Sequence, residues 1–432
     1  MKKYILITLT TFILILQISC KEEIISFDGQ NSSSVTINWQ NSFGGKDFDD
    51  ISSIIKTSDG GYMAVGSSLS SDWDYWVLKF DADFNLLWER KFGGTNADFG
   101  KCIVETESNN YVIAGYSNST DGNITLNKGG YDIWIIKISS EGVLVWQKNY
   151  GGTGSETITE ESILTTNLGG YVFSATTTSD DYDVIGQKGG ADIWLVNIND
   201  TSEIVWAKTY GGADDDFSNR IKYTPDGSYM LSNIVQSVGG DILYNYDKKD
   251  IWLARINSSG DIMWQKTIGG TGTESQCDIT MTSDGGIIVM TQTSSKDGEV
   301  QKNYGNKDIW FSKIDATGNI VWNTIFGGSL DENSGEIIQL SDGGYLASIS
   351  SNSIDYFLGF NYGKKDICLI KLSETGTIEW TKIFGGTDDE YSNSLLELSS
   401  NSILVTANSK SEDFDITKHI GGFDFWLFTV NY

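Results

Sequence analysis

The stretch DIWFSKIDATGNIVWNTIFGG, residues 308–328, decides the fold of this chain. It contains an apolar strand, the turn Asp315–Gly318, a second strand around Trp322 and a closing Gly-Gly pair. The stretch DIWLARINSSGDIMWQKTIGG at residues 250–270 has the same pattern. Recurrence at a fixed period predicts stacked supersecondary units rather than a single irregular domain.

The pattern occurs seven times and continues to the last residues of the chain. Its period is about 58 residues, with a shorter first step. Each first glycine of the pair follows a tryptophan by five residues. The glycine pairs begin at Gly44, Gly93, Gly151, Gly211, Gly269, Gly327 and Gly385, and the tryptophans are Trp39, Trp88, Trp146, Trp206, Trp264, Trp322 and Trp380.

Within one unit the sequence predicts four strands joined by turns and one longer loop. In the unit after Gly269 the strands are expected at 276–282, 287–293, 308–314 and 319–326. A four-stranded antiparallel meander of this length has the size of a propeller blade. The third strand is apolar on both faces, as expected when neighbouring blades cover both sides.

The two ends of the chain predict how the ring closes. The seventh unit stops after its third strand, 424–430, and an unpaired strand at 34–43 precedes the first unit. Together these two pieces complete one blade and remove the open edge. We therefore predict an all-β fold in which residues 34–432 form one seven-bladed β-propeller, with the N-terminal strand as the outer strand of the last blade.

The first residues resemble a bacterial lipoprotein signal peptide. Lys2 and Lys3 precede an apolar core, and residues 1–19 end just before Cys20. The resemblance implies lipidation of Cys20, followed by a polar tether at 20–33. The residues 21–23, Lys-Glu-Glu, are similar to the acidic export signal of Bacteroidota surface lipoproteins. We expect a lipid anchor in the bacterial outer membrane, facing the cell surface; an ordinary secretory peptide is the alternative.

The charge balance limits the classes of partner. Acidic residues outnumber basic ones by 58 to 30, which gives a net charge of −28. Such a surface repels nucleic acid and anionic lipid, so membrane contact is expected only through the anchor. Cys102, Cys277 and Cys368 lie in different units, which argues against a disulfide framework. We expect a monomer with a protein or glycan partner.

Two sets of repeated residues on the third strand are interpreted as structural. The aromatic set is expected to pack between blades, and an aspartate two residues before it is expected to accept N–H groups of the loop. The tryptophans are Trp76, Trp134, Trp194, Trp252, Trp310 and Trp426, with Cys368 in the remaining place, and the aspartates are Asp74, Asp132, Asp192, Asp250, Asp308, Asp366 and Asp424. Trp73, off this pattern in an expected loop, and Tyr356 are the candidate surface aromatics.

A third repeated set is the candidate site. An acidic residue follows each first glycine by five positions, near the expected start of the innermost strand. These carboxylates could ring the central channel and attract Ca²⁺ or a cationic ligand, or each could cap the neighbouring crossover. The residues are Asp49, Asp98, Glu156, Asp216, Glu274, Glu332 and Glu390. No other cofactor is expected.

The repeat resembles two known families. The pattern W-x-K-x-[FY]-G-G with D-G-G-Y and D-I-W-[LI] is similar to the bacterial seven-bladed propeller repeats called SBBP, which implies a secreted propeller without an assigned activity. The turn at 315–322 is similar to the tryptophan-docking turn of quinoprotein-type repeats, but the vicinal cysteines of quinone dehydrogenases are missing.

Catalytic patterns are sparse in this sequence. The single His419 and the three arginines argue against a Ser-His-Asp triad and a sialidase-type arginine triad. The expected function is therefore a non-enzymatic binding or scaffolding lipoprotein that uses loops on one propeller face. A carboxylate-based glycoside hydrolase or lyase and a Ca²⁺-organised ring remain the alternatives.

Overall fold

The computed structural model describes residues 35–167 and 169–432. The expected signal peptide, Cys20 and the tether lie outside these ranges. Every regular element in the described ranges is a β-strand. None of them holds a helix with the length and hydropathy needed to cross a membrane.

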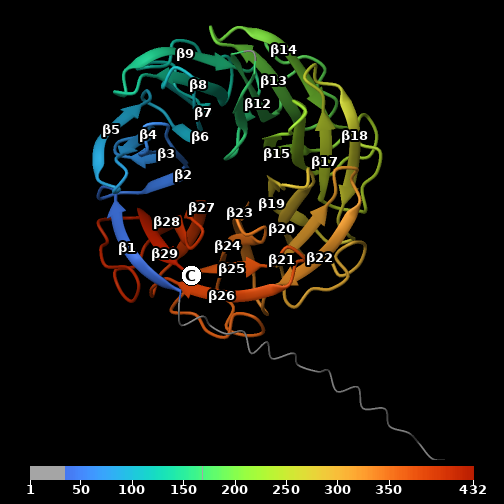
Figure 1. Ribbon diagram of the computed structural model, residues 1–432. Helices are drawn as coiled ribbons and strands as arrows, with labels where there is room; N and C mark the ends of the chain where they lie inside the picture. The colour runs from blue at the N-terminus through green and yellow to red at the C-terminus, as the bar shows by residue number, and fades with distance from the viewer. Residues whose placement is uncertain (1–34, 168) are drawn as a thin grey trace, which may run out of the picture.

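Seven antiparallel sheets surround a central axis, as Figure 1 shows. Six sheets follow the chain in order from the innermost to the outermost strand, which confirms the predicted seven-bladed propeller. The inner strands are β2 (Asp49–Lys56), β6 (Asp98–Glu105), β10 (Glu156–Thr157) with β11 (Ile163–Thr165), β15 (Asp216–Tyr223), β19 (Glu274–Met281), β23 (Glu332–Gln339) and β27 (Glu390–Ser399). In the third blade the inner strand is thus interrupted.

The remaining strands complete the blades. The second strands are β3 (Tyr62–Leu69), β7 (Tyr111–Ser117), β12 (Gly170–Thr177), β16 (Tyr229–Val235), β20 (Ile287–Thr293), β24 (Tyr345–Ser351) and β28 (Ser402–Ser409). The third strands are β4 (Trp73–Phe80), β8 (Asp132–Ile138), β13 (Asp192–Asn199), β17 (Asp250–Ile256), β21 (Asp308–Ile314), β25 (Asp366–Leu372) and β29 (Asp424–Asn431). The outer strands are β5 (Leu86–Phe92), β9 (Leu144–Tyr150), β14 (Ile204–Tyr210), β18 (Ile262–Ile268), β22 (Ile320–Phe326), β26 (Ile378–Phe384) and β1 (Thr36–Phe43).

The N-terminal strand closes the ring as predicted. Strand β1 pairs antiparallel with β29, so the last blade has the order β1-β29-β28-β27. Across this pair the indole Nε1 of Trp426 donates to Gln40 Oε1 at 3.0 Å. The first and last described strands therefore belong to one sheet, and the last blade has four strands like the others.

The third strands form the centre of the core. Nearly all their residues are buried, because the neighbouring blades cover both faces of each sheet. All six third-strand tryptophans are buried, which confirms their interpretation as packing residues. Cys368 replaces the seventh and is buried between Ile349 of β24 and Ile383 of β26.

The tryptophans of the outer strands pack against the next blade. Trp322 is half-buried, and its indole lies against Gly376, in the turn of the following blade. Gly376 has a φ of +80°, and a Cβ added there would overlap the Trp322 ring. The turn therefore needs glycine for both its backbone conformation and its contact with the tryptophan.

The inner strands share an irregularity that exposes backbone groups toward the axis. Pairing shifts by a bulge in β15, between Ser218 and Arg220, and in β23, between Ser334 and Ile337. The freed N–H of Ile337 donates to Asp278 Oδ2, on the preceding blade, at 2.8 Å. Bulges turn side chains away from the regular alternation, and here they bring polar residues to the central channel.

Candidate functional site

The crossovers between blades and the loops after the second strands lie on one face. Asp121 of such a loop accepts the N–H of Thr95, in a crossover, at 2.8 Å. Asp297 accepts the N–H of Thr271 in the same way at 2.7 Å. These bonds join each crossover to the neighbouring loop and define the loop face of the propeller.

The seven candidate carboxylates lie in the junctions between blades. Each is the first residue of an inner strand, and each is buried. Each accepts the N–H of the second glycine of its pair, as Asp216 does from Gly212 at 2.8 Å and Glu390 from Gly386 at 2.9 Å. Glu332 also accepts hydroxyl groups of Ser351 and Ser353. The capping role proposed as the alternative accounts for these hydrogen bonds.

The third-strand aspartates lie beside these carboxylates. Asp250 Oδ2 accepts the N–H of Tyr246 at 2.6 Å, as expected for a carboxylate at a strand entry. The other aspartates that accept a loop N–H are Asp132, Asp192, Asp308, Asp366 and Asp424. Asp74 accepts no such bond from the residues that the structure describes, because the corresponding loop of the first blade is nearly absent.

At each junction the two sets meet across the crossover glycine. A Cβ at Gly269 would overlap both Asp250 Oδ1 and Glu274 Oε2. Asp250 Oδ1 is buried and receives no N–H or O–H donor from the described residues, although Asp250 shares a hydrogen bond with Glu274. Because two carboxylates offer only acceptors, one proton must lie between them.

The proton on these pairs has a clear physical origin. Burial, together with the neighbouring charge of Glu274, raises the pKa of Asp250 to about 8. Burial and the charges of Glu332 and Glu390 raise the pKa values of Asp308 and Asp366 to about 7. Within residues 35–167 and 169–432, no group of three or more His, Cys, Asp or Glu side chains is placed to hold a metal ion.

The loop face carries two groups of contacting aromatic side chains over the last three blades. Tyr304 contacts Tyr356 with ring centroids 5.1 Å apart, and Tyr362 contacts both Phe360, at 5.1 Å, and Phe414, at 5.0 Å. Tyr356 and Phe414 are 48% and 63% exposed. These five residues, named the aromatic rim below, join the loops of three successive blades.

Trp73, the other candidate surface aromatic, has a different position. The expectation that it lies in a loop is wrong, because it is the first residue of β4. It is half-buried and packs against Phe99, with ring centroids 5.6 Å apart. The first blade's short connection lets its third strand begin earlier than in the other units.

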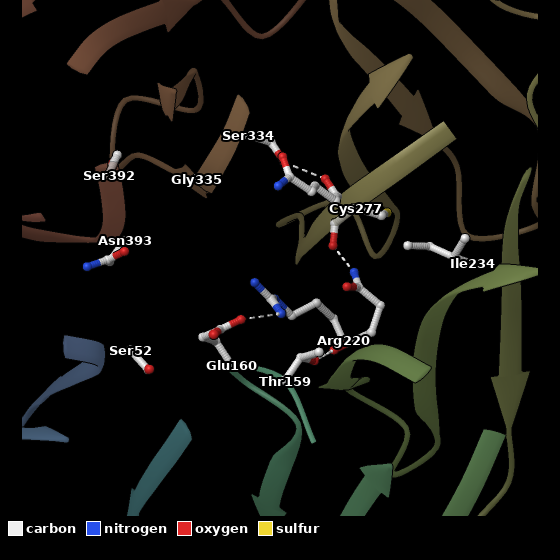
Figure 2. Close-up of a pocket in the computed structure, with 12 residues that line it drawn as sticks. Ser52, Thr159, Glu160, Arg220, Ile234, Cys277, Ser334, Gly335, Ser392 and Asn393 are labelled. Atoms are coloured by element: carbon white, nitrogen blue, oxygen red, sulfur yellow. Dashed lines mark hydrogen bonds and ion pairs between the residues drawn. The ribbon is translucent and has the colours of Figure 1, made fainter. Parts of the chain in front are cut away.

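A polar cavity of about 330 Å³ lies in the central channel, lined mainly by inner-strand residues. Figure 2 shows Arg220 reaching into it from one side, with Ser52 and Asn393 across the gap. Arg220 pairs with Glu160, Nη1 to Oε2, at 3.3 Å, and with Asp278, Nε to Oδ1, at 3.2 Å. Lys101 Nζ lies 3.4 Å from Glu160 Oε1.

The acids of this network have unequal environments. Against the effect of burial, Lys101 and Arg220 hold the pKa of Glu160 at about 2. Burial and the charge of Glu161 raise the pKa of Asp278 to about 6, and the same two causes raise that of Glu336 well above its ordinary value. Acids in different protonation states near one cavity are what a carboxylate-based hydrolase or lyase requires.

Sequence reasoning missed this network. The sequence does contain a signal for this network: the seven repeat units differ in residue type at the fourth position after each of the seven candidate carboxylates. The residues at that position are Ser53, Cys102, Glu160, Arg220, Asp278, Glu336 and Ser394. Four successive blades thus carry charged residues where the other three carry small ones, and tertiary structure brings those four together.

Comparisons with known proteins identify the fold alone. No protein family matches the chain, and neither does any curated protein. A protein of unknown function from Dyadobacter fermentans is similar with a TM-score of 0.50 and 11% identity, covering 92% of this chain and 99% of its own. An ulvan lyase is similar with a TM-score of 0.54 and 8% identity, covering 85% of this chain and 93% of its own. The Neurospora crassa Pan2 WD40 domain is similar with a TM-score of 0.52 and 8% identity, covering 92% of this chain and 95% of its own. The chain is therefore a seven-bladed β-propeller, and its resemblance to SBBP repeats stays a prediction.

Proposed function

We propose that this protein is a surface-tethered binding or scaffolding protein that engages a protein partner through its loop face. The aromatic rim is the observation that carries the proposal. Soluble surfaces rarely keep linked aromatic side chains in solvent, and aromatic residues are enriched in the centres of protein interfaces. Tyr304, Tyr356 and their neighbours stand on loops anchored to a rigid ring, which limits the entropy lost on binding.

The residues around the rim favour a protein over a glycan. Ile354 and Ile420 belong to the same loops and are exposed by 65% and 39%. Glycan sites need flat rings to stack on sugars, whereas aliphatic side chains contribute mainly to apolar protein contacts. Because the chain has a net charge of −28, a partner with basic residues around an apolar centre has the complementary surface.

The tether sets where this binding would take place. A lipid on Cys20 would hold the ring at the outer membrane, with the loop face free to contact other surface proteins. The lipoprotein pattern of residues 1–20 supports this location. The binding role itself rests on the rim and holds for any extracytoplasmic location.

Capture from a surface extract tests the proposal. The double variant Tyr356→Ala with Phe414→Ala removes two rings of the rim from solvent-exposed positions. The matched control is Val145→Ala with Val205→Ala, which removes side chains of 54% and 60% exposure from outer strands β9 and β14. We expect the rim variant to lose a protein that the wild type and the control both retain.

The outcomes separate the alternatives. Equal capture by all three forms contradicts a role for the rim. Loss of a carbohydrate that survives protease treatment of the extract would assign the loop face to glycan binding instead. Circular dichroism of each variant confirms that the ring is intact.

A further inference from the structure

The central channel contains polar groups that the fold leaves without partners. Ser392 Oγ and Asn393 Nδ2, both on β27, are buried and form no hydrogen bond with the described residues. Both residues line the cavity that also contains Arg220. Buried polar atoms normally have partners, so unpaired groups beside a cavity point to a missing hydrogen-bonding molecule.

Arg220 also has N–H groups that its ion pairs do not use. Its contacts with Glu160 and Asp278 use two of the five N–H groups of a guanidinium. Figure 2 places its side chain in the gap opposite Asn393, so a molecule between them would meet guanidinium donors on one side and the amide group of Asn393 on the other. Glu160, beside Arg220, and the hydroxyl of Ser52, across the gap, add acceptors to the lining.

The charge balance of the lining selects against an ionic ligand. Arg220 and Glu160 are the charged residues among those that line the cavity, and they pair with each other at 3.3 Å. A bound anion would face Glu160, and a bound cation would face Arg220. The lining thus has no unpaired full charge to offer, and a neutral molecule disturbs the network least.

The composition of the lining also selects against an apolar ligand. Ile234 is the large aliphatic residue of the cavity, and no aromatic side chain lines it within the described ranges. The volume of about 330 Å³ corresponds to about ten waters of bulk liquid. This space accepts a single hydroxylated ring but not a folded peptide.

The backbone of the channel wall departs from regular strand geometry at the same place. Gln276, which lines the cavity, has a φ of +49°, and Glu161, beside Arg220, has a φ of +55°. Left-handed backbone is costly for these residue types and collects at functional sites. Four successive blades also carry charged residues here, where the other three carry small ones. Closing the ring does not require this departure from the repeat.

We infer that the channel binds a neutral, hydroxyl-rich molecule the size of a monosaccharide, held between Arg220 and Asn393. This site is separate from the aromatic rim, and its test is independent of the proposed protein partner. Hydroxyl groups both donate and accept, which matches the alternation of amide, guanidinium, hydroxyl and carboxylate around the cavity.

Titration calorimetry with single sugars tests the inference. The neutral probes are glucose, galactose, mannose and fucose, and glucuronate and glucosamine are charged counterparts of nearly the same shape. We expect at least one neutral sugar to bind the purified full-length protein, with both charged counterparts weaker. Asn393→Ala should weaken the affinity for that sugar by about five- to tenfold, because one hydrogen bond is lost.

A matched control keeps the result specific. Asn352 follows β24 in a loop, has a buried unpaired Oδ1 and does not line the cavity. Asn352→Ala should bind as the wild type does. The inference is overturned if no neutral sugar binds up to roughly 10 mM, if only a charged sugar binds, or if Asn393→Ala binds unchanged.

Discussion

Asp250 and Glu274 lie on neighbouring blades and share one hydrogen bond across the Gly269-Gly270 crossover. Each carboxyl group is otherwise bound by its own blade: Asp250 by the N–H of Tyr246, and Glu274 by the hydroxyls of Thr293 and Ser295. The arrangement recurs at the next two junctions, where Asp308 pairs with Glu332 and Asp366 with Glu390. At these three junctions a shared proton joins two neighbouring sheets.

The junction protons predict that stability falls as the pH rises toward 8. The pKa of Asp250 is raised to about 8, above an unperturbed value of about 3.9. The stability contributed by the neutral form is therefore complete below pH ~4 and is lost as the pH rises through about 8. Wild-type Tm, measured from pH 5 to 9, should decrease over this range.

Amide substitutions at the junctions test this origin directly. Asp250→Asn, combined with Asp308→Asn and Asp366→Asn, keeps a donor toward each partner and an acceptor for each loop N–H, but cannot ionise. We expect the triple variant to have a flatter Tm profile and a higher Tm than wild type at pH 9. Glu379→Gln, an exposed change on β26, is the control and should follow wild type. A triple variant whose profile parallels wild type would rule out the junction protons as the cause.

Acids with lowered pKa values act in a different pH range. Against the effect of burial, hydrogen bonds from Lys79 and Thr57 hold the pKa of Asp59 at about 2. Its contribution is present above pH ~4 and is lost as the pH falls through about 2. Measurements above pH 5 therefore isolate the junction pairs from such groups.

The contact between Trp322 and Gly376 predicts a large effect of one methyl group. Gly376→Ala and Gly343→Ala both place alanine in left-handed backbone, with φ values of +80° and +88°. A Cβ at Gly376 overlaps Trp322, whereas one at Gly343 meets nothing within 4 Å. We expect Gly343→Ala to cost about 1 kcal/mol and Gly376→Ala a further 1–3 kcal/mol or so in free energy of unfolding. Equal losses in urea denaturation would show that the tryptophan contact adds nothing.

The pairing of β1 with β29 predicts that the N-terminal strand stabilises the whole ring. Deletion of residues 34–43 removes the outer strand of the last blade and exposes the edge of β29. We expect the entire domain, not the last blade alone, to melt at a lower temperature, because each blade is packed against two neighbours. A protein that lacks only residues 21–33 is the control. Identical melting of the two truncated forms would contradict a closing role for β1.

The lipoprotein pattern predicts a modification at Cys20. Cys20→Ala should prevent incorporation of a radiolabelled fatty acid and release the protein from the membrane fraction. Cys102→Ala, a change at a buried cysteine of the ring, is the control and should stay with the membrane. Label retained after Cys20→Ala would place the anchor elsewhere, and absence of label in wild type would favour an ordinary secretory peptide.

The repeat pattern was sufficient to predict the ring. The chain has a glycine pair and a tryptophan at a fixed period, four turn-separated strands per unit, an unpaired strand before the first unit and a last unit that lacks its fourth strand. This combination leaves few ways to bury the apolar third strands. Local patterns of this kind are visible in sequence because turn geometry and strand alternation depend on neighbouring residues. For the same reason the Gly-Gly crossovers, the core tryptophans and the strand-entry aspartates were predictable.

The contacts that these residues make were visible only in the folded structure. Asp250 and Glu274 belong to two separate repeated sets, and only the crossover places them in one buried junction. The successive loops of the aromatic rim are about one blade apart in sequence, and so are the channel residues Glu160, Arg220 and Asp278. The repeat shows that these three residues occupy equivalent positions, but it does not show that they contact one another. Contacts between blades depend on ring closure and on the bulges of the inner strands, which are properties of the whole fold.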